Sequence, residues 1–213
     1  MLNAVEVRVL GSLIEKDMTT PEYYPLTLNA LAAACNQKNN RHPVVSYNDD
    51  TVSAALESLR AKGLVLMVLP SAGSRVAKYA HRISENWNLG RRELAVMCVL
   101  LLRGPQTPGE INARTERMCQ FSDLTEVESC LERLMHFEPD PLAVRLPRQP
   151  GAKESRYAHL LSGPPEIPAT PVPAAAGTMD DDRIGKIEAR VEEIAGELRQ
   201  LRSEFDELMR QLK

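Results

Sequence analysis

The sequence predicts a mainly α-helical α+β fold in which small β-hairpins accompany the helices, followed by a long C-terminal helix. Three observations support this prediction: apolar residues recur at helical spacing after capping residues, a unit of about 75–80 residues is repeated, and the chain ends in apolar heptads. Hydrophobic residues make up 43% of the 213 residues and aromatic residues only 4%. The core must therefore be built largely from aliphatic side chains and methionine.

The internal repeat consists of three motifs that occur twice, in the same order. Their patterns are T-x3-[LI], V-x3-L-E-x-L and [KR]-Y-A-H. They pair 27–31 with 107–111, 52–59 with 127–134, and 78–81 with 156–159. One match could arise by chance, but three in order indicate two copies of one unit.

The first copy contains the signals of three helices. Asn3 is expected to cap the first helix, with Glu6 at the third helical position, which is the spacing of a capping box. Thr27 is expected to cap a second helix from Leu28 to about Cys35. Asn48 can cap a third that ends near Gly63, a residue suited to the left-handed conformation that stops a helix.

A hairpin should follow these helices, because two β-prone runs flank a turn-forming cluster at 70–74. The first strand is expected at Leu64–Leu69 and the returning strand at Val76–Ile83.

The second copy repeats the plan. Its expected helices are Glu93–Leu102, a helix that starts after Thr107 with Pro108 at its first position, and a helix that Asp123 opens and that ends near Phe137. The expected strands are Leu142–Leu146 and Ser155–Leu161.

Three helices and a hairpin form the winged-helix arrangement, in which helices two and three make a helix-turn-helix and the hairpin is the wing. We therefore predict tandem winged-helix domains, a linker that contains five prolines within ten residues, and a coiled-coil helix. The expected boundaries are 1–86, 87–162, 163–182 and 183–213.

Long ungapped motifs across residues 2–162 resemble the YceH-like family. The resemblance implies a bacterial, cytosolic, tandem winged-helix protein and assigns it no activity. The motifs are RVLGxLIEK at 8–16, TTPExYPLxLNxL at 19–31, ACNQKxNRxP at 34–43, LRGPQTPGE at 102–110 and LPRxPGxKExRYxHL at 146–160.

Cationic and amide side chains concentrate in the loop before the first copy's third helix and in both wings, where they suit contacts to a nucleic-acid backbone and to base edges. A solvated loop and solubilising charge on exposed hairpins are the alternative interpretations. The candidate nucleic-acid contacts are Lys38, Asn40, Arg41, Arg75, Lys78, Arg82, Arg145, Arg148, Lys153 and Arg156.

The third helices argue against a conventional major-groove reader. They carry acidic side chains, among them Asp49, Asp50, Glu128 and Glu132, which would repel phosphate. Acidic residues in a first helical turn also favour the helix dipole, so part of this pattern has a purely structural explanation.

Apolar residues fill every first and fourth position of the C-terminal heptads, which is typical of a coiled-coil seam and predicts a homodimer. A helix folded back on the rest of the chain is the alternative, although the apolar stripe is narrow for that role. The seam comprises Ile184, Ile187, Val191, Ile194, Leu198, Leu201, Phe205, Leu208 and Leu212.

Several function classes are disfavoured. The formal net charge of −3 does not suit coating of nucleic acid or membrane by charge alone, and the longest apolar run, 94–102, is too short for a membrane span. The four cysteines lack zinc spacing and indicate reduced thiols, and with no secretory signal we expect a cytoplasmic location.

We find no motif for catalysis, metal or cofactor, and expect no enzyme. Two hypotheses remain: a dimer that binds DNA or a DNA-bound machine, and a scaffold that binds a protein partner.

Overall fold

The computed structural model describes residues 1–69, 76–149 and 151–165, which all fall within one unit, Met1–Ile167. It is a mixed α+β fold with seven α-helices and small antiparallel sheets among those residues. The elements are α1 (Ala4–Thr19), the 3₁₀ turn Pro21–Tyr23, β1 (Leu26–Thr27), α2 (Leu28–Cys35), α3 (Asp49–Ala61), β2 (Val65–Val68), β3 (Lys78–His81), α4 (Ile83–Trp87), α5 (Arg91–Arg103), α6 (Pro108–Thr115), α7 (Leu124–Met135), β4 (Ala143–Arg145) and β5 (Tyr157–His159).

The helices of the first half, residues 1–86, begin at the predicted capping residues. Asn3 and Glu6 form the expected capping box at α1, and the side chains of Thr27 and Asn48 accept hydrogen bonds at the starts of α2 and α3. Gly63 follows α3 with φ +72°, as expected. The three strands pair in the order β1–β3–β2, with Tyr79 opposite both Leu26 and Met67.

The second half uses the same local signals. Thr107 and Glu110 form the predicted capping box at α6, with Pro108 at its first position. Asp123 accepts a hydrogen bond from the Glu126 amide at the start of α7. Strands β4 and β5 pair antiparallel, and Gln106 makes an isolated bridge to Tyr157.

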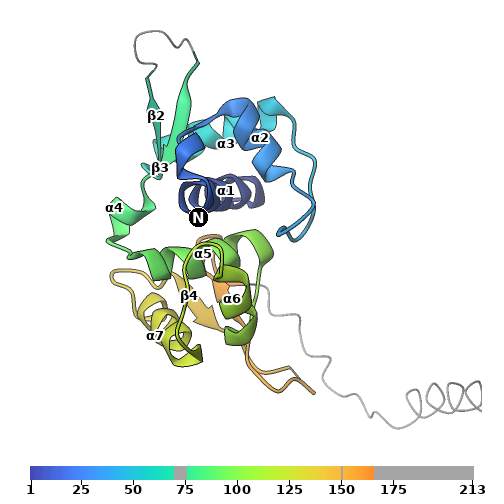
Figure 1. The fold of residues 1–213 in the computed structure, drawn as a ribbon, viewed down its shortest axis with the longest axis vertical. Coiled ribbons are helices and arrows are strands. Elements are labelled where there is room, and N and C mark those ends of the chain that lie inside the picture. The colour runs from blue at the N-terminus through green and yellow to red at the C-terminus, as the bar shows by residue number, and fades with distance from the viewer. Residues whose placement is uncertain (70–75, 150, 166–213) are drawn as a thin grey trace, which may run out of the picture. The chain divides into compact units, whose positions relative to one another are not determined.

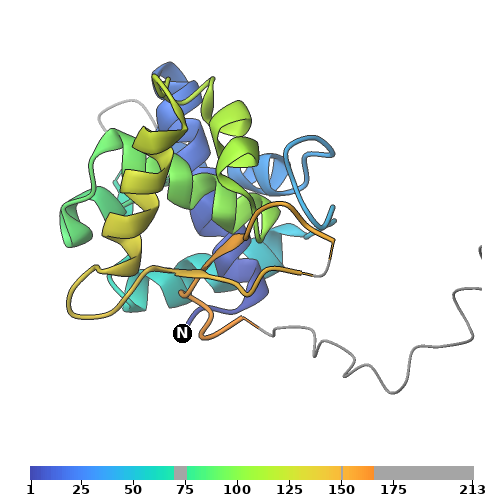
Figure 2. The same ribbon diagram turned by 90° about the horizontal axis from the view of Figure 1, so that it is seen from below.

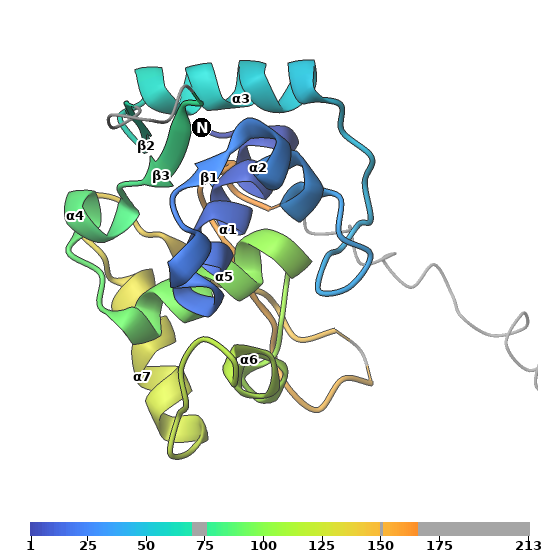
Figure 3. The same ribbon diagram turned by 45° about the horizontal axis from the view of Figure 1, so that its top comes forward.

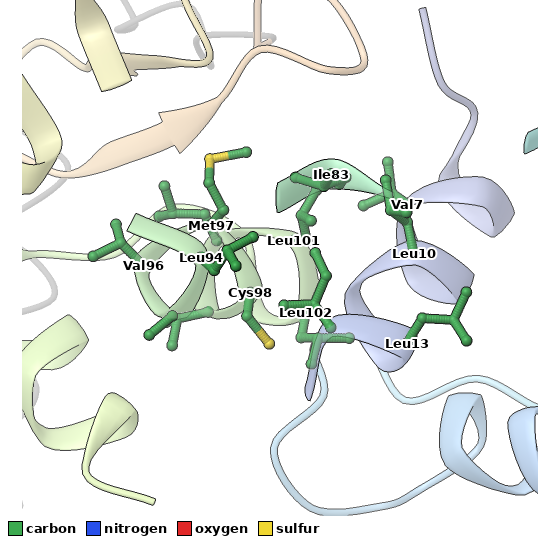
Figure 4. Close-up of a cluster of buried hydrophobic side chains, with 14 of the residues drawn as sticks. Val7, Leu10, Leu13, Ile83, Leu94, Val96, Met97, Cys98, Leu101 and Leu102 are labelled. Carbon is green, nitrogen blue, oxygen red and sulfur yellow. The ribbon is translucent and has the colours of Figure 1, made fainter. Parts of the chain in front are cut away.

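Helices α1 and α5 pack against one another at the centre of the unit (Figure 1). Gly11 permits this approach, because a Cβ atom there would lie 2.9 Å from Leu102 Cδ2 and 3.1 Å from Leu101 Cβ. Figure 4 shows Leu101 and Leu102 on the side of α5 that faces Val7 and Leu10 of α1, whereas Val96 points to the opposite side. Because both helices lie inside this shared core, the two halves have a common apolar interior.

The two hairpins project in different directions. In Figure 1, β2 and β3 extend beyond the helices at the top, while the connection between β4 and β5 extends away at the bottom. Figure 3 places α3 at one end and α6 and α7 at the other, with α1 and α5 between them. The α2–α3 loop and the tip of the β4–β5 connection lie on the same side of the unit, as Figure 2 also shows. One chain therefore does not present both hairpins on one face.

The expected strand at 76–83 was wrong at its end, because β3 stops at His81 and the helix α4 begins at Ile83. Ile83 is fully buried there, and Asn86 Nδ2 donates a hydrogen bond of 2.8 Å to the carbonyl oxygen of Gly63. Asn88, with φ +46°, then ends the helix. Burial of Ile83 against the core overrides the β-propensity of the preceding run.

The predicted coiled-coil seam from Ile184 to Leu212 lies outside the described residues, as does most of the predicted linker. Within the described ranges no helix is long and apolar enough to cross a membrane.

Candidate nucleic-acid interface

The β4–β5 hairpin carries the most open of the predicted contacts. Arg145 ends β4, and Arg148 and Lys153 flank the tip of the connection; all three are exposed. Within the described part of the chain none of the three lies within 4 Å of a carboxylate. These side chains are therefore available to an anionic partner.

Arg156 has a structural role instead. Its Nη1 and Nη2 atoms lie 2.7 and 3.0 Å from the two Glu110 carboxylate oxygens, and Nη1 also donates to the carbonyl oxygen of Pro105 at 2.9 Å. Burial opposes ionisation of Glu110, but hydrogen bonds from the Thr107 amide and Arg156 outweigh it, so the pKa of Glu110 lies below its ordinary value. Arg156 thus fastens β5 to the start of α6 and is committed to that contact.

The β2–β3 hairpin contributes less than expected. Lys78 is exposed at the start of β3. Arg82 Nε lies 3.2 Å from Glu85 Oε2, although this pair is largely solvent-exposed and weak. Arg75 lies outside the described residues.

The structure contradicts the prediction that Arg41 is a nucleic-acid contact. Its side chain is fully buried, and Nη2 lies 2.6 Å from Glu15 Oε2 and 2.9 Å from the carbonyl oxygen of Ala34. Arg8 makes a similar contact, donating at 2.6 Å to the carbonyl oxygen of Pro43. Both arginines tie the α2–α3 loop to the body of the unit, so Arg41 cannot reach a phosphate in this conformation.

The other two candidates in the α2–α3 loop, Lys38 and Asn40, differ in whether the side chain already has a partner within the protein. Lys38 is exposed, whereas Asn40 adopts φ +60° and its Oδ1 accepts a hydrogen bond from Arg103 Nη2. Three further cations, Arg103, Arg114 and Arg117, were not among the predicted contacts, and they line one cavity together with Lys38. Their positions in α5, in α6 and just after α6 carry no local signal, because only the tertiary fold brings these segments beside the loop.

The exposed face of α7 is acidic, as the sequence indicated. Glu128 and Glu132 line a groove between α7 and the hairpin, opposed by Arg145. In α3, Asp49, Asp50 and Glu57 are likewise exposed. Phosphate brought to either helix face would meet these carboxylates.

The two matching histidines have different surroundings, because His81 is buried and His159 is half-buried. His81 Nε2 lies 3.3 Å from Asp17 Oδ2, and burial lowers the pKa of His81 although Asp17 opposes the shift. Burial lowers the pKa of His159 to about 4. The Nδ1 atoms of both have no hydrogen-bond partner among the described residues. Both are therefore expected to be neutral at pH 7.

The cysteines have the environment of structural thiols. Cys35, Cys98 and Cys130 are buried, and burial raises the pKa of each of them and of the half-buried Cys119. Among the residues that the structure describes, no group of three His, Cys, Asp or Glu side chains is placed to hold a metal ion. Raised thiol pKa values disfavour the thiolate that metal binding or nucleophilic attack requires.

Comparison with known proteins finds close relatives over nearly the whole chain. Residues 2–152 match the family model described as "Protein of unknown function, DUF480". A UPF0502 protein from Solibacter usitatus is 51% identical over 207 residues, covering 96% of this chain and 98% of the relative. A UPF0502 protein from Pelobacter propionicus is 50% identical, covering 100% and 99%, and one from Geobacter metallireducens is 56% identical, covering 78% and 74%.

Proposed function

Because the chain belongs to the DUF480 (UPF0502) family, whose description assigns no activity, we propose from its geometry that it is a non-enzymatic tandem winged-helix protein that binds DNA. The contacts are made to the phosphate backbone by the tip of the β4–β5 hairpin and by the α2–α3 loop. The observation that carries this proposal is the exposed pair Arg148 and Lys153, which project at the hairpin tip with no carboxylate partner within the described ranges.

The order of elements supports the winged-helix part of the proposal. In each half two helices, α2 and α3 or α6 and α7, precede an antiparallel hairpin. The segment before the second helix pairs with the returning strand in both halves, through Leu26 with Tyr79 and through Gln106 with Tyr157. Tyr79 and Tyr157 occupy matching places in the sequence repeat. A helix-turn-helix followed by a wing is an arrangement that DNA-binding proteins use.

The acidic faces of α3 and α7 define the mode of binding. Glu128 and Glu132 repel phosphate along the helix that a conventional reader would insert into the major groove. Wing and loop contacts avoid that repulsion and carry little sequence information, because they reach phosphates more than bases. We therefore propose weak, strongly salt-dependent binding.

The C-terminal heptads support a dimer. Paired seams would bring together two compact units, each offering Lys38, Arg148 and Lys153. Full-length protein at tens of micromolar should sediment as a dimer. The chain ending at Gly163 should sediment as a folded monomer, and replacing Ile194 and Leu201 by Asp should have the same effect, because each charge would lie in the apolar seam. A monomeric full-length protein would contradict the dimer.

A fluorescence anisotropy titration on random-sequence duplex tests DNA binding. With three cations from each chain, a dimer makes six phosphate contacts, so affinity should fall roughly a thousandfold between 50 and 200 mM salt. The double variant R148Q/K153Q should reduce the slope of log affinity against log salt by roughly two units for each chain in contact. Its matched control is R114Q/R117Q, which removes the same charge from α6 and its C-terminal end.

Two results would reject DNA binding by the hairpin tip. The first is no binding by 10 µM dimer at 50 mM salt. The second is binding whose salt slope is the same in wild type and R148Q/K153Q.

A protein-binding scaffold is the second candidate, because the groove beside α7 is lined by Glu128 and Glu132 and suits a basic segment of a partner. A pull-down with and without nuclease separates the two functions. Partners of a scaffold should remain after nuclease treatment and be lost from the charge-reversal variant E128K/E132K. Partners bridged by DNA should disappear with nuclease in the wild-type protein.

A further inference from the structure

A cavity of about 460 Å³ lies where the two halves meet, at some distance in sequence from either hairpin. We call it the junction pocket. Its walls come from the end of α1, the α2–α3 loop, α5, and the end of α6 with the residues that follow it. It is lined by Glu15, Lys16, Thr19, Thr20, Gln37, Lys38, Asn39, Asn40, Cys98, Val99, Leu102, Arg103, Arg114, Arg117 and Met118.

The lining is strongly cationic. Five of these residues, Lys16, Lys38, Arg103, Arg114 and Arg117, carry positive charge, against the single carboxylate of Glu15. That carboxylate is already occupied, because both of its oxygens accept hydrogen bonds from the buried Arg41 at 2.6 and 3.0 Å. The junction pocket therefore holds a concentrated positive charge that its own acidic group does not offset.

The cations have few competing partners. Arg117 and Lys38 are exposed and have no carboxylate within 4 Å in the part of the chain that the structure describes. Arg114 lies 3.8 Å from Glu110, whose carboxylate is already bound by Arg156. Arg103 donates to the neutral Asn40, and burial together with repulsion from Arg114 lowers the pKa of Arg103. Like charges gathered in this way favour an anionic ligand.

Four apolar residues, Cys98, Val99, Leu102 and Met118, contribute to the lining, and we call them the floor of the pocket. Cys98 and Leu102 are at most 2% exposed, and Val99 and Met118 are also buried. The side-chain amide of Gln37 keeps its hydrogen-bond donors, because its oxygen is the atom that accepts from Arg41. Charged walls, free amide donors and an apolar floor together suit a molecule with an anionic end and an uncharged body.

We propose that the junction pocket binds a small phosphorylated molecule of nucleotide size. Its phosphates contact Arg103, Arg114, Arg117 and Lys38, and its uncharged part lies against the atoms of Val99, Leu102 and Met118 that reach the cavity. Guanidinium groups suit phosphate because their planar fork donates two parallel hydrogen bonds. A concave site with a buried floor fits a small ligand better than a duplex, whose backbone would reach only the rim.

Such a ligand would bridge the two halves. Lys38 belongs to the first half, whereas Arg103, Arg114 and Arg117 belong to the second. Binding adds contacts between segments that are otherwise joined mainly by the α1–α5 core, so ligand should raise the unfolding temperature.

Isothermal titration calorimetry on the full-length protein tests the proposal with four probes: inorganic phosphate, pyrophosphate, ATP and adenosine. ATP and pyrophosphate should bind, ATP more tightly because adenosine adds contact with the floor. Adenosine alone should show no heat at millimolar concentration. If inorganic phosphate and pyrophosphate bind as tightly as ATP, the site takes free phosphates and the nucleotide-sized part of the proposal is wrong.

Two double variants with equal loss of charge make the test specific. R114Q/R117Q should weaken ATP binding at least tenfold, and K38Q, which changes only an exposed loop residue, should weaken it severalfold. The control R148Q/K153Q should bind ATP within twofold of wild type. Circular dichroism and the unfolding temperature without ligand establish that each variant is folded.

The outcomes separate this proposal from DNA binding. No heat from ATP or pyrophosphate at 1 mM, or equal weakening in both double variants, would overturn it. If instead R114Q/R117Q lowers the salt slope for duplex DNA and ATP does not bind, the pocket is a backbone-phosphate site and the small-ligand proposal is wrong. Loss of DNA binding in R148Q/K153Q alone leaves ATP binding as predicted.

Discussion

The connection between α2 and α3 in the first half spans residues 36–48 and is held by a buried ion pair, whereas its counterpart between α6 and α7 is shorter and is held differently. In the first half Arg41, with a fully buried side chain, contacts Glu15. In the second half Arg91 donates to the carbonyl oxygen of Met118 at 3.0 Å, and its other contact is the carbonyl oxygen of Met18. A buried charge pair is worth little until one partner is removed, so the first connection is the more vulnerable one.

This difference matters for function because the α2–α3 loop supplies Lys38 to the junction pocket and to the proposed DNA contacts. Arg41, which the sequence pattern favours as a DNA contact, instead holds that loop in place through its contacts with Glu15 and Ala34. The second half has exposed cations at its hairpin tip, and its ion pairs, Arg156 with Glu110 and Arg133 with Glu93, each include a partly or largely exposed arginine. We therefore predict that loss of a carboxylate that pairs with an interior arginine destabilises the first half more than the equivalent loss destabilises the second.

The largest effect is expected from E15A. Removal of this carboxylate leaves Arg41 buried without a counter-charge, which should lower the free energy of unfolding by about 3 kcal/mol. The matched control is E93A in α5, whose partner Arg133 has a side chain that is 68% exposed and can return to water. E93A should therefore cost less than about 1 kcal/mol. Urea unfolding followed by circular dichroism measures both, and equal losses would contradict the proposed contrast.

A second contrast concerns how the two matching histidines, His81 and His159, affect stability at acidic pH. The pKa of His159 is about 4 in the folded protein and about 6.5 when exposed, so the unfolded chain binds more protons between these values. Stability should therefore fall as pH drops from 6.5 toward 4, by at most about 3 kcal/mol. H159F should flatten this part of the pH profile. H81F should flatten it less, because Asp17 supports the charged form of His81.

Unfolding free energies measured at pH 7.0, 6.0, 5.0 and 4.5 test this contrast. Wild type and H159F should diverge as the pH falls. Parallel profiles for the two proteins would show that His159 does not titrate on unfolding as expected.

Local interactions explain which parts of the fold were predictable. The caps at Asn3, Thr27, Asn48, Thr107 and Asp123 join residues only three positions apart, so the sequence alone carries their geometry. The strand pairs follow from β-prone runs on either side of a turn. By contrast, the helix α4 depends on burial of Ile83 against distant helices, which no short window contains.

The site was predicted less well, because its chemistry depends on partners far away in the sequence. Glu15 lies 26 residues from Arg41, and Glu110 lies 46 residues from Arg156. From the sequence alone Arg41 and Arg156 look like unpaired cations, whereas in the folded protein each forms an ion pair with a carboxylate. Arg114 and Arg117 show the reverse case, since they become notable only where the fold places them opposite Lys38.

The smallest contrast lies between the caps of the two second helices, Thr27 at α2 and Thr107 at α6. Thr107 belongs to a capping box, because the Glu110 carboxylate accepts a hydrogen bond of 3.0 Å from the Thr107 amide. Thr27 accepts a single hydrogen bond, at 3.3 Å from the Ala30 amide. T107A removes only the bond of 3.2 Å that the Thr107 hydroxyl accepts from the Glu110 amide, because the backbone amide of residue 107 still donates to the Glu110 carboxylate. T107A and T27A should therefore each cost about 1 kcal/mol.

The serine variants T107S and T27S are the controls, because they retain the hydroxyl that caps the helix. Each should recover most of the stability that the alanine variant loses at the same position. Urea midpoints can resolve the difference if the slope of unfolding free energy against urea is unchanged. A T107A loss clearly larger than that of T27A would contradict this expectation and would mean that the Thr107 hydroxyl also holds the Glu110 carboxylate in place. E110Q would then weaken the start of α6 as well as loosen the β4–β5 hairpin, because the carboxylate contacts both the Thr107 amide and Arg156.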